Sequence, residues 1–186
     1  MRYETFNPEV HDVLKVAQLV YDVDFRTFDM LFKSSESAVN AISKSLLDED
    51  LETFTVILDD DGNVIGILIY YIDKFPKHFY FKSLRLLIVD ILDYFVLCDV
   101  GPGDLYIAEI AIDSSLRGRG LGKKVLCEVI DYAKEKNLNR VILDADFRNT
   151  AAKRLYENIG FRQFNKKRVK FLNFERGMYN MELILD

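Results

Sequence analysis

The sequence is poor in the residues that build disulfide, metal and serine-nucleophile sites. Among 186 residues there is no tryptophan, and there are three prolines, two histidines and two cysteines. Cys98 and Cys127 lack metal or redox spacing, so we expect reduced, buried thiols. His11 and His78 lie far apart without metal-ligand spacing, and no G-x-S-x-G motif occurs. We therefore expect neither a metal site nor a serine nucleophile.

Positive charge is also in deficit. The chain has 25 Lys and Arg against 30 Asp and Glu, which gives a net charge of −5. This balance argues against nucleic-acid binding through a basic surface. Met1–Val10 has no apolar signal core, so we expect a cytoplasmic protein. The apolar stretch Phe79–Cys98 contains Asp90, and a central aspartate costs about 2.5–3.5 kcal/mol in a membrane span, so we expect no membrane partner.

Length and apolar content predict one folded domain. Hydrophobic residues make up 49% of the chain, and 186 residues are enough to bury a full core. No internal repeat or low-complexity tract occurs. We therefore expect a single domain over residues 1–186, with an inserted and mainly helical segment at about residues 73–103.

The most informative stretch runs from Leu105 to Lys136. An apolar run, Leu105–Asp113, predicts a strand, and Lys123–Lys136 has the periodicity of an amphipathic helix. Between them lies a turn with alternating glycines, whose missing side chains let backbone N–H groups approach a ligand. A helix N-terminus adds positive potential there, and four cations surround it: Arg117, Arg119, Lys123 and Lys124. The stretch predicts a phosphate site; an ordinary glycine-rich turn with solvated arginines is the alternative.

The spacing of this turn excludes two common nucleotide-binding motifs. Lys123 is not followed by Ser or Thr, as a P-loop requires, and it stands where a dinucleotide fingerprint needs its third glycine. The motif present is R-x-x-G-x-G, from Arg117 to Gly122. Downstream, the apolar strand Arg140–Asp146 is followed by N-x-x-A-x-x-L-Y-x-x-x-G-F over Asn149–Phe161. With both motifs in this order, the sequence resembles the GNAT superfamily of N-acetyltransferases.

The resemblance implies an α/β fold and an acetyl-CoA site. In this family a mixed, twisted sheet of about six to seven strands carries helices on both faces, and the two strands that flank the loop helix run parallel and splay. The backbone of Ile110 and Ile112 is then expected to bind pantetheine, as is Asn149, for which a helix N-cap is the alternative. The pyrophosphate is expected on the loop residues Arg117, Gly118, Arg119, Gly120, Gly122 and Lys123.

The resemblance also implies two catalytic groups. Tyr156 occupies the position of the family's tyrosine, the general acid that protonates the departing thiolate; an aromatic core residue is the alternative. Glu109 is the one carboxylate in an apolar setting within the cofactor strand, and we expect it to be the general base. A water relay competes with it, as do four other residues: Asp104, Tyr106, Asp144 and Asp146.

The remaining elements are predicted from local patterns. Asn7-Pro8 predicts a helix start, with a buried stripe that includes Val10 and Leu14. Phe54–Ile72 predicts a hairpin that turns at Asp61-Gly62. The other expected elements are a strand at Arg2–Phe6, an aromatic segment at Asp22–Lys33 (core anchors or acceptor border), a helix at Ser35–Leu47, a helix within Leu84–Phe95, and two strands with a loop over Phe161–Asp186.

Two functions remain open at this level. The first is an acetyl-CoA-dependent N-acetyltransferase acting on a primary amine of a small molecule or of a protein or peptide. The alternative is a non-catalytic acyl-CoA-binding sensor or regulatory module. The inserted segment could wall the acceptor pocket, form a homodimer contact or simply pack in the core, and the basic run Lys166–Lys170 is expected to be a solvated turn.

Overall fold

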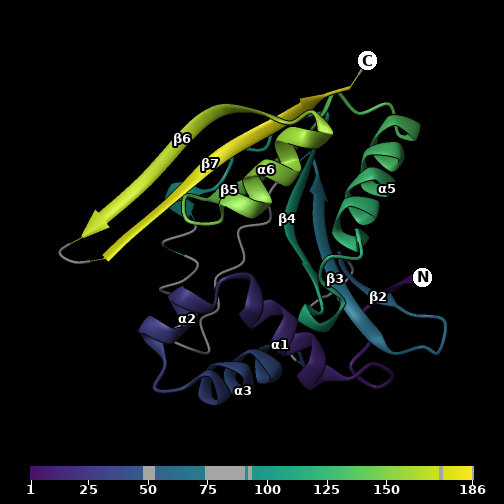
Figure 1. The fold of residues 1–186 in the computed structure, drawn as a ribbon, viewed down its shortest axis with the longest axis vertical. Coiled ribbons are helices and arrows are strands. Elements are labelled where there is room, and N and C mark those ends of the chain that lie inside the picture. The colour runs from purple at the N-terminus through teal and green to yellow at the C-terminus, as the bar shows by residue number, and fades with distance from the viewer. Residues whose placement is uncertain (48–52, 74–90, 92–93, 172–173, 186) are drawn as a thin grey trace. The chain divides into compact units, whose positions relative to one another are not determined.

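The computed structural model describes residues 1–47, 53–73, 91, 94–171 and 174–185 (Figure 1). These residues fall into two compact units. The first is built mainly from Met1–Tyr70 and Glu109–Gly122, and the second mainly from Asp90–Ala108 and Lys123–Asp186. The expectation of a single domain over residues 1–186 stays a prediction.

The strands form one mixed sheet, hydrogen-bonded in the order β1-β2-β3-β4-β5-β7-β6. The neighbours β4 and β5 pair in parallel, whereas β1 with β2, β2 with β3, β5 with β7 and β6 with β7 are antiparallel. This confirms the expected α/β class, strand number and parallel central pair. The strands are β1 (Arg2–Thr5), β2 (Phe54–Leu58), β3 (Val64–Ile72), β4 (Asp104–Ile112), β5 (Arg140–Asp146), β6 (Arg162–Phe171) and β7 (Phe174–Ile184).

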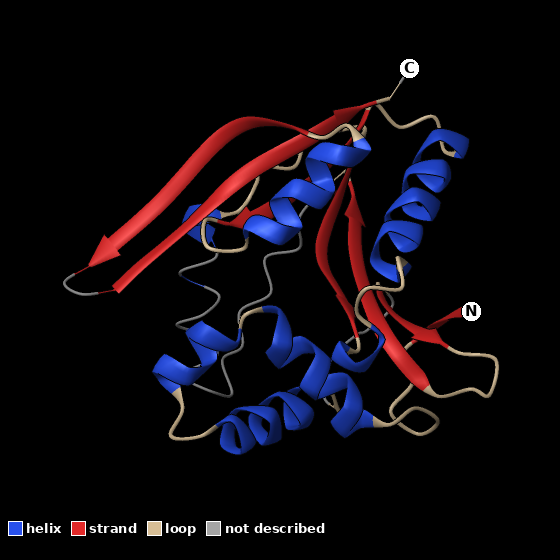
Figure 2. Cartoon of the chain, viewed as in Figure 1, coloured by secondary structure: helices blue, strands red, loops and turns tan. Residues whose placement is uncertain are grey.

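Three helices of the first unit, α1 (Val13–Val23), α2 (Phe25–Leu31) and α3 (Ser35–Ser45), gather together, as Figures 1 and 2 show. The predicted helix at Ser35–Leu47 is confirmed as α3, which a capping box of Ser34 and Ser37 opens. In the aromatic segment Phe28 and Phe32 are buried, as core anchors would be, while Phe25 is exposed.

The predicted start of the first helix is wrong. The side chain of Asn7 accepts a hydrogen bond from the Glu9 amide, but this turn closes at His11 and does not propagate. Instead Asp12 caps the helix, because its Oδ1 accepts from the Lys15 amide at 3.0 Å. The buried residues of α1 are Val16, Ala17, Leu19 and Tyr21. Val10 precedes the helix, and both Val10 and Leu14 are exposed, contrary to the predicted stripe.

The hairpin prediction is confirmed by β2 and β3. Asp59 organises the turn, since its carboxylate accepts hydrogen bonds from the amides of Asp61 and Asn63 at 3.0 and 2.8 Å. Gly62 has φ +88°, a conformation that glycine adopts without strain. Within β3, Gly66 lies against β4, where a Cβ would stand 2.6 Å from the carbonyl oxygen of Ala111. The two strands therefore approach each other closely at this glycine.

The second unit contains the parallel pair β4 and β5 and the helices α5 (Leu121–Glu135) and α6 (Thr150–Ile159). The amphipathic helix predicted at Lys123–Lys136 is confirmed as α5, whose buried residues are Val125, Leu126, Val129, Ile130 and Ala133. The basic run Lys166–Lys170 is not a turn; it lies within β6 and pairs with β7 (Figure 1). Strand β6 ends the sheet, and a solvated edge strand holds lysines as readily as a turn does.

The predicted helix within Leu84–Phe95 lies mostly outside the described residues. Of that segment, Ile91, Tyr94 and Phe95 are described, and they are helical and exposed. Across the described ranges, no helix combines the length and apolarity that a membrane crossing requires.

The close packing at Gly66 gives a stability prediction. Gly66→Ala places a methyl group 2.6 Å from the Ala111 carbonyl and 2.8 Å from the Ile112 side chain, so two packed strands must move apart. We expect the free energy of unfolding to fall by about 1–3 kcal/mol, as overpacking costs. Denaturant unfolding measures this. Gly101→Ala is the control, because its Cβ would make only an ordinary contact at 3.5 Å. Equal stability of the two variants would contradict the close contact between Gly66 and β4.

Candidate active site

The glycine-rich turn joins β4 to α5 through a short 3-10 helix, η1 (Ser114–Leu116). Asp113 caps η1, since its carboxylate accepts a hydrogen bond from the Ser115 amide at 2.8 Å. Gly118 and Gly120 follow with φ +79° and +74°. Only glycine adopts these angles without strain, so the turn needs this residue type at both positions.

The turn offers donors and positive charge to an anion. The first amides of α5 have no partner within the helix, and they carry the positive end of its dipole. Arg117, Arg119 and Lys123 are exposed, and within the described ranges none of them has a carboxylate partner. A Cβ built at Gly118, Gly120 or Gly122 would meet no protein atom within 4 Å, so the backbone here is open to a ligand. These residues fit the pyrophosphate of acetyl-CoA.

Helix α1 is tied to the start of this turn. The Lys15 ammonium forms an ion pair with the Asp113 carboxylate, and it lowers the pKa of Asp113 to about 2. Because the pKa is depressed, the contact is present at neutral pH and is lost only as the pH falls towards 2. The residue that caps η1 therefore stays ionised under ordinary conditions.

The pairing of β4 with β5 stops before either strand ends. The parallel register runs from Asp104–Arg140 to Ile107–Leu143, while β4 continues to Ile112 and β5 to Asp146. Glu109, Ile110 and Ile112 thus lie in the part of β4 beyond this register, and all three are half-buried. Their roles toward pantetheine and the acceptor stay predictions.

Tyr156 lies on α6, whose N-terminus Asn149 caps by accepting a hydrogen bond from the Ala152 amide at 3.1 Å. The N-cap alternative for Asn149 is therefore confirmed, and its contact with the cofactor stays a prediction. The Tyr156 ring is buried and packs on Phe161, with 6.0 Å between the ring centroids. Among the described residues none hydrogen-bonds its hydroxyl.

The environment of Tyr156 keeps its hydroxyl protonated. Burial, and then the negative charge of Asp144, raise the pKa of Tyr156 to about 12. A phenol with this pKa carries its proton throughout the neutral range. A proton is therefore present on this hydroxyl at neutral pH, and its role as the acid of the reaction stays a prediction.

The structure separates the carboxylates that compete for the role of base. Asp104 is held by the Arg140 guanidinium through two hydrogen bonds of 2.7 and 2.9 Å. Burial of Asp146 opposes its ionisation, yet its hydrogen bonds from Arg148 lower the pKa of Asp146 overall. Both carboxylates are committed to arginines. Asp144 differs from both, because burial raises its pKa. The role of Glu109 stays a prediction.

Sequence reasoning missed two residues around Asp144. Cys98 and Asn180 both contact its carboxylate, although they lie 46 and 36 positions away in the chain. Such long-range polar contacts leave no periodic signal in the sequence.

Sequence comparison with known proteins matches most of the chain to one family. The model of the acetyltransferase (GNAT) family matches residues 18–161. N-alpha-acetyltransferase 30 of Saccharomyces cerevisiae is 32% identical over 68 residues, 37% of this chain and 39% of that protein. Mycothiol acetyltransferase of Renibacterium salmoninarum is 38% identical over 63 residues, 34% of this chain and 18% of that protein. The matches thus span less than two fifths of either relative.

Solved structures share the whole fold at low identity. An N-acetyltransferase from Staphylococcus aureus Mu50 has a TM-score of 0.65 and 21% identity, and the match covers 98% of this chain and all of that one. The NatC complex bound to Gag peptide and CoA contains a chain with a TM-score of 0.57 and 19% identity, covering 100% of this chain and 98% of that one.

The cofactor loop gives the second prediction. In Gly120→Val a branched side chain fills the open space over the loop backbone, so we expect CoA affinity to fall at least tenfold in isothermal titration calorimetry. Gly62→Val is the matched control, because Gly62 also has positive φ and lies in an exposed turn of the hairpin. It carries similar backbone strain and should retain CoA affinity. Unchanged affinity in a folded Gly120→Val protein would show that the loop is not the pyrophosphate site.

Proposed function

The chain belongs to the acetyltransferase (GNAT) family, and from that premise we propose that it transfers an acetyl group from acetyl-CoA to a primary amine of a small molecule or of a protein or peptide. The observation that carries this proposal is the state of Tyr156, a buried phenol with a raised pKa and no hydrogen-bond partner among the described residues. A module that only binds acyl-CoA has no need of such a proton donor. The relatives, which include N-alpha-acetyltransferase 30 and mycothiol acetyltransferase, support acetyl transfer without selecting the acceptor.

The loop residues supply cofactor binding in this proposal. The open backbone at Gly118–Gly122 and the first amides of α5 bind the pyrophosphate, with Arg117, Arg119 and Lys123 as additional charges. Ile110, Ile112 and Asn149 are proposed to contact pantetheine through the strand backbone and the helix cap. Acetyl-CoA then supplies an activated thioester.

The reaction needs one group that accepts a proton and one that donates a proton. The neutral amine nitrogen attacks the thioester carbonyl carbon, a C–N bond forms, and the C–S bond breaks as the tetrahedral intermediate collapses. Tyr156 gives its proton to the departing thiolate, and a base takes the proton that the amine loses, so the products are an N-acetyl amide and the free thiol of CoA. The candidates that we propose for this base are Glu109 and Asp144.

An acceptor panel tests the activity itself. Acetyl-CoA is mixed with the protein and with small primary amines or with peptides that carry a free N-terminus, and release of the CoA thiol is followed. We expect release above the acetyl-CoA background with at least one acceptor class. Tight CoA binding without amine-dependent release across the panel would contradict the proposal and favour an acyl-CoA-binding sensor.

Removal of the Tyr156 hydroxyl tests the acid. Tyr156→Phe keeps the ring packing and breaks no hydrogen bond to a described residue, so we expect melting temperature and CoA affinity to change little. The maximal rate should fall by roughly 10²–10⁴-fold, the contribution of a positioned general acid. Tyr132→Phe on α5 is a matched control that loses a hydroxyl elsewhere. Wild-type turnover in Tyr156→Phe would exclude Tyr156 as the acid and leave water to protonate the thiolate.

A further inference from the structure

The carboxylate of Asp144 lies at the place where two strands of the second unit cease to pair. Asp144 is the residue of β5 directly after Leu143, the last one paired with β4. Its Oδ2 accepts hydrogen bonds from the Cys98 amide at 3.0 Å and from the Tyr106 hydroxyl at 2.9 Å. These two donors come from the end of the inserted segment and from β4.

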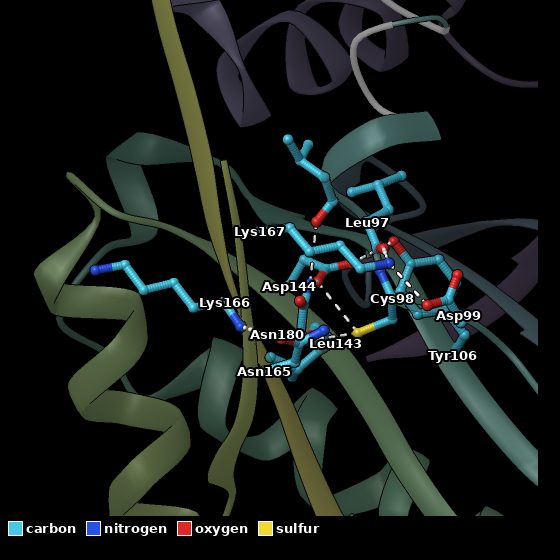
Figure 3. A network of polar contacts seen from close by, with 11 residues as sticks. Leu97, Cys98, Asp99, Tyr106, Leu143, Asp144, Asn165, Lys166, Lys167 and Asn180 are labelled. Carbon is cyan, nitrogen blue, oxygen red and sulfur yellow. Dashed lines mark hydrogen bonds and ion pairs between the residues drawn. The ribbon is translucent and has the colours of Figure 1, made fainter. Parts of the chain in front are cut away.

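The other oxygen of the same carboxylate is also occupied. The Cys98 thiol lies 3.1 Å from Oδ1, and the side-chain amide of Asn180 on β7 donates to Oδ1 as well (Figure 3). The Asn180 amide also donates to the carbonyl of Val96 at 3.0 Å, which fixes its orientation. Donors from the 96–98 segment, β4 and β7 therefore converge on one side chain of β5.

Packing alone does not explain a carboxylate at this position. Burying a charge is costly, and an apolar side chain would join the neighbouring core of Cys98, Tyr106 and Ile142 without that cost. Asn180 is fully buried, and its Oδ1 has no hydrogen-bond partner among the described residues. An unpaired buried acceptor costs stability, so packing does not explain Asn180 at this position either.

We propose that Cys98, Tyr106 and Asn180 are positioning residues that hold the Asp144 carboxylate as the proton acceptor of the acetyl transfer. This rests on the proposed N-acetyltransferase function. The proton lost by the amine nitrogen passes to Asp144 as the C–N bond forms, while Tyr156 protonates the thiolate. Afterwards Asp144 releases its proton to solvent and Tyr156 regains one from solvent. Burial raises the pKa of Asp144 above its usual range, so this carboxyl group accepts a proton more readily than an exposed aspartate does.

The charged and titratable neighbours of this carboxylate are few. Tyr106 of β4 and Cys98 donate to it directly, and Tyr156 of α6 is close enough for the charge of Asp144 to raise the tyrosine's pKa. On β6, Lys167 donates to the Leu97 carbonyl and to Asp99, each at 2.8 Å, and so anchors the segment that carries Cys98. Lys167 and Arg140 act on the Cys98 thiol electrostatically, against its burial and the Asp144 charge.

The pH dependence of kcat/KM tests the positioning role. Each donor stabilises the ionised carboxylate, so its removal raises the pKa of Asp144 and moves the acid limb to higher pH. We expect a shift of about one to two pH units in Tyr106→Phe and a smaller shift in Cys98→Ala. Cys98→Ser retains a donor and should restore the limb toward its wild-type position. The profile is measured with two acceptor amines of different pKa. A limb that reports a group of the enzyme stays at the same pH with both amines, whereas a limb that reports ionisation of the amine moves with its pKa.

Matched variants distinguish a positioning role of Cys98 and Tyr106 from a purely structural one. Cys127→Ser and Tyr132→Phe change a thiol and a hydroxyl on α5 outside the network and should leave the limb in place. A fall in melting temperature for Tyr106→Phe and Cys98→Ala with an unmoved limb would overturn the proposal. So would a limb that survives in Asp144→Asn and is lost in Glu109→Gln. Absence of amine acetylation by the wild-type protein would instead refute the proposed function.

A second measurement covers the case in which Cys98→Ala fails to fold. The Asp144 carboxyl group is then titrated by carbon NMR in Tyr106→Phe and Cys98→Ser, and an unchanged pKa of Asp144 in Tyr106→Phe contradicts the proposal.

Discussion

Parallel pairing of β4 with β5 is the constraint from which the candidate site follows. Two consecutive parallel strands cannot be joined by a hairpin, so the chain must cross between them, and α5 makes that crossing. The turn that enters α5 then follows the C-terminal end of β4, where helix amides become available to an anion. The register stops at Ile107–Leu143, which leaves the last residues of both strands for other contacts.

Burial changes the pKa values of side chains that would have ordinary values in water. Tyr156 is buried and has its pKa raised to about 12, so it holds a proton. Asp144 is surrounded by four donated hydrogen bonds and also has a raised pKa, so it accepts a proton more readily than an exposed aspartate. Asp104 and Asp146 show the contrast, because adjacent arginines bind them. The environment, more than the residue type, therefore sets which of these groups holds a proton at neutral pH.

The elements with strong local signals were predictable, and those decided by distant contacts were not. The α5 stripe, the hairpin with its Gly62 turn and both family motifs follow from periodicity and spacing within a few residues. The start of α1 was misplaced because Asn7 and Asp12 both suit a helix cap, and tertiary packing selects the second. The basic run in β6 was misassigned because charge alone does not distinguish an edge strand from a turn. The Asp144 network depends on pairings between segments far apart in the sequence, which a single sequence does not encode locally.

The central claim is acetyl transfer to an amine with proton donation by Tyr156, and mass spectrometry of the reaction tests it most directly. The wild-type protein, acetyl-CoA and an acceptor amine are mixed, and the acetylated amine and the free CoA thiol are quantified together. The account predicts equal amounts of an N-acetyl amide and free thiol, formed only when the protein and both substrates are present. Thiol release without the amide, or binding of CoA with neither product, would contradict it.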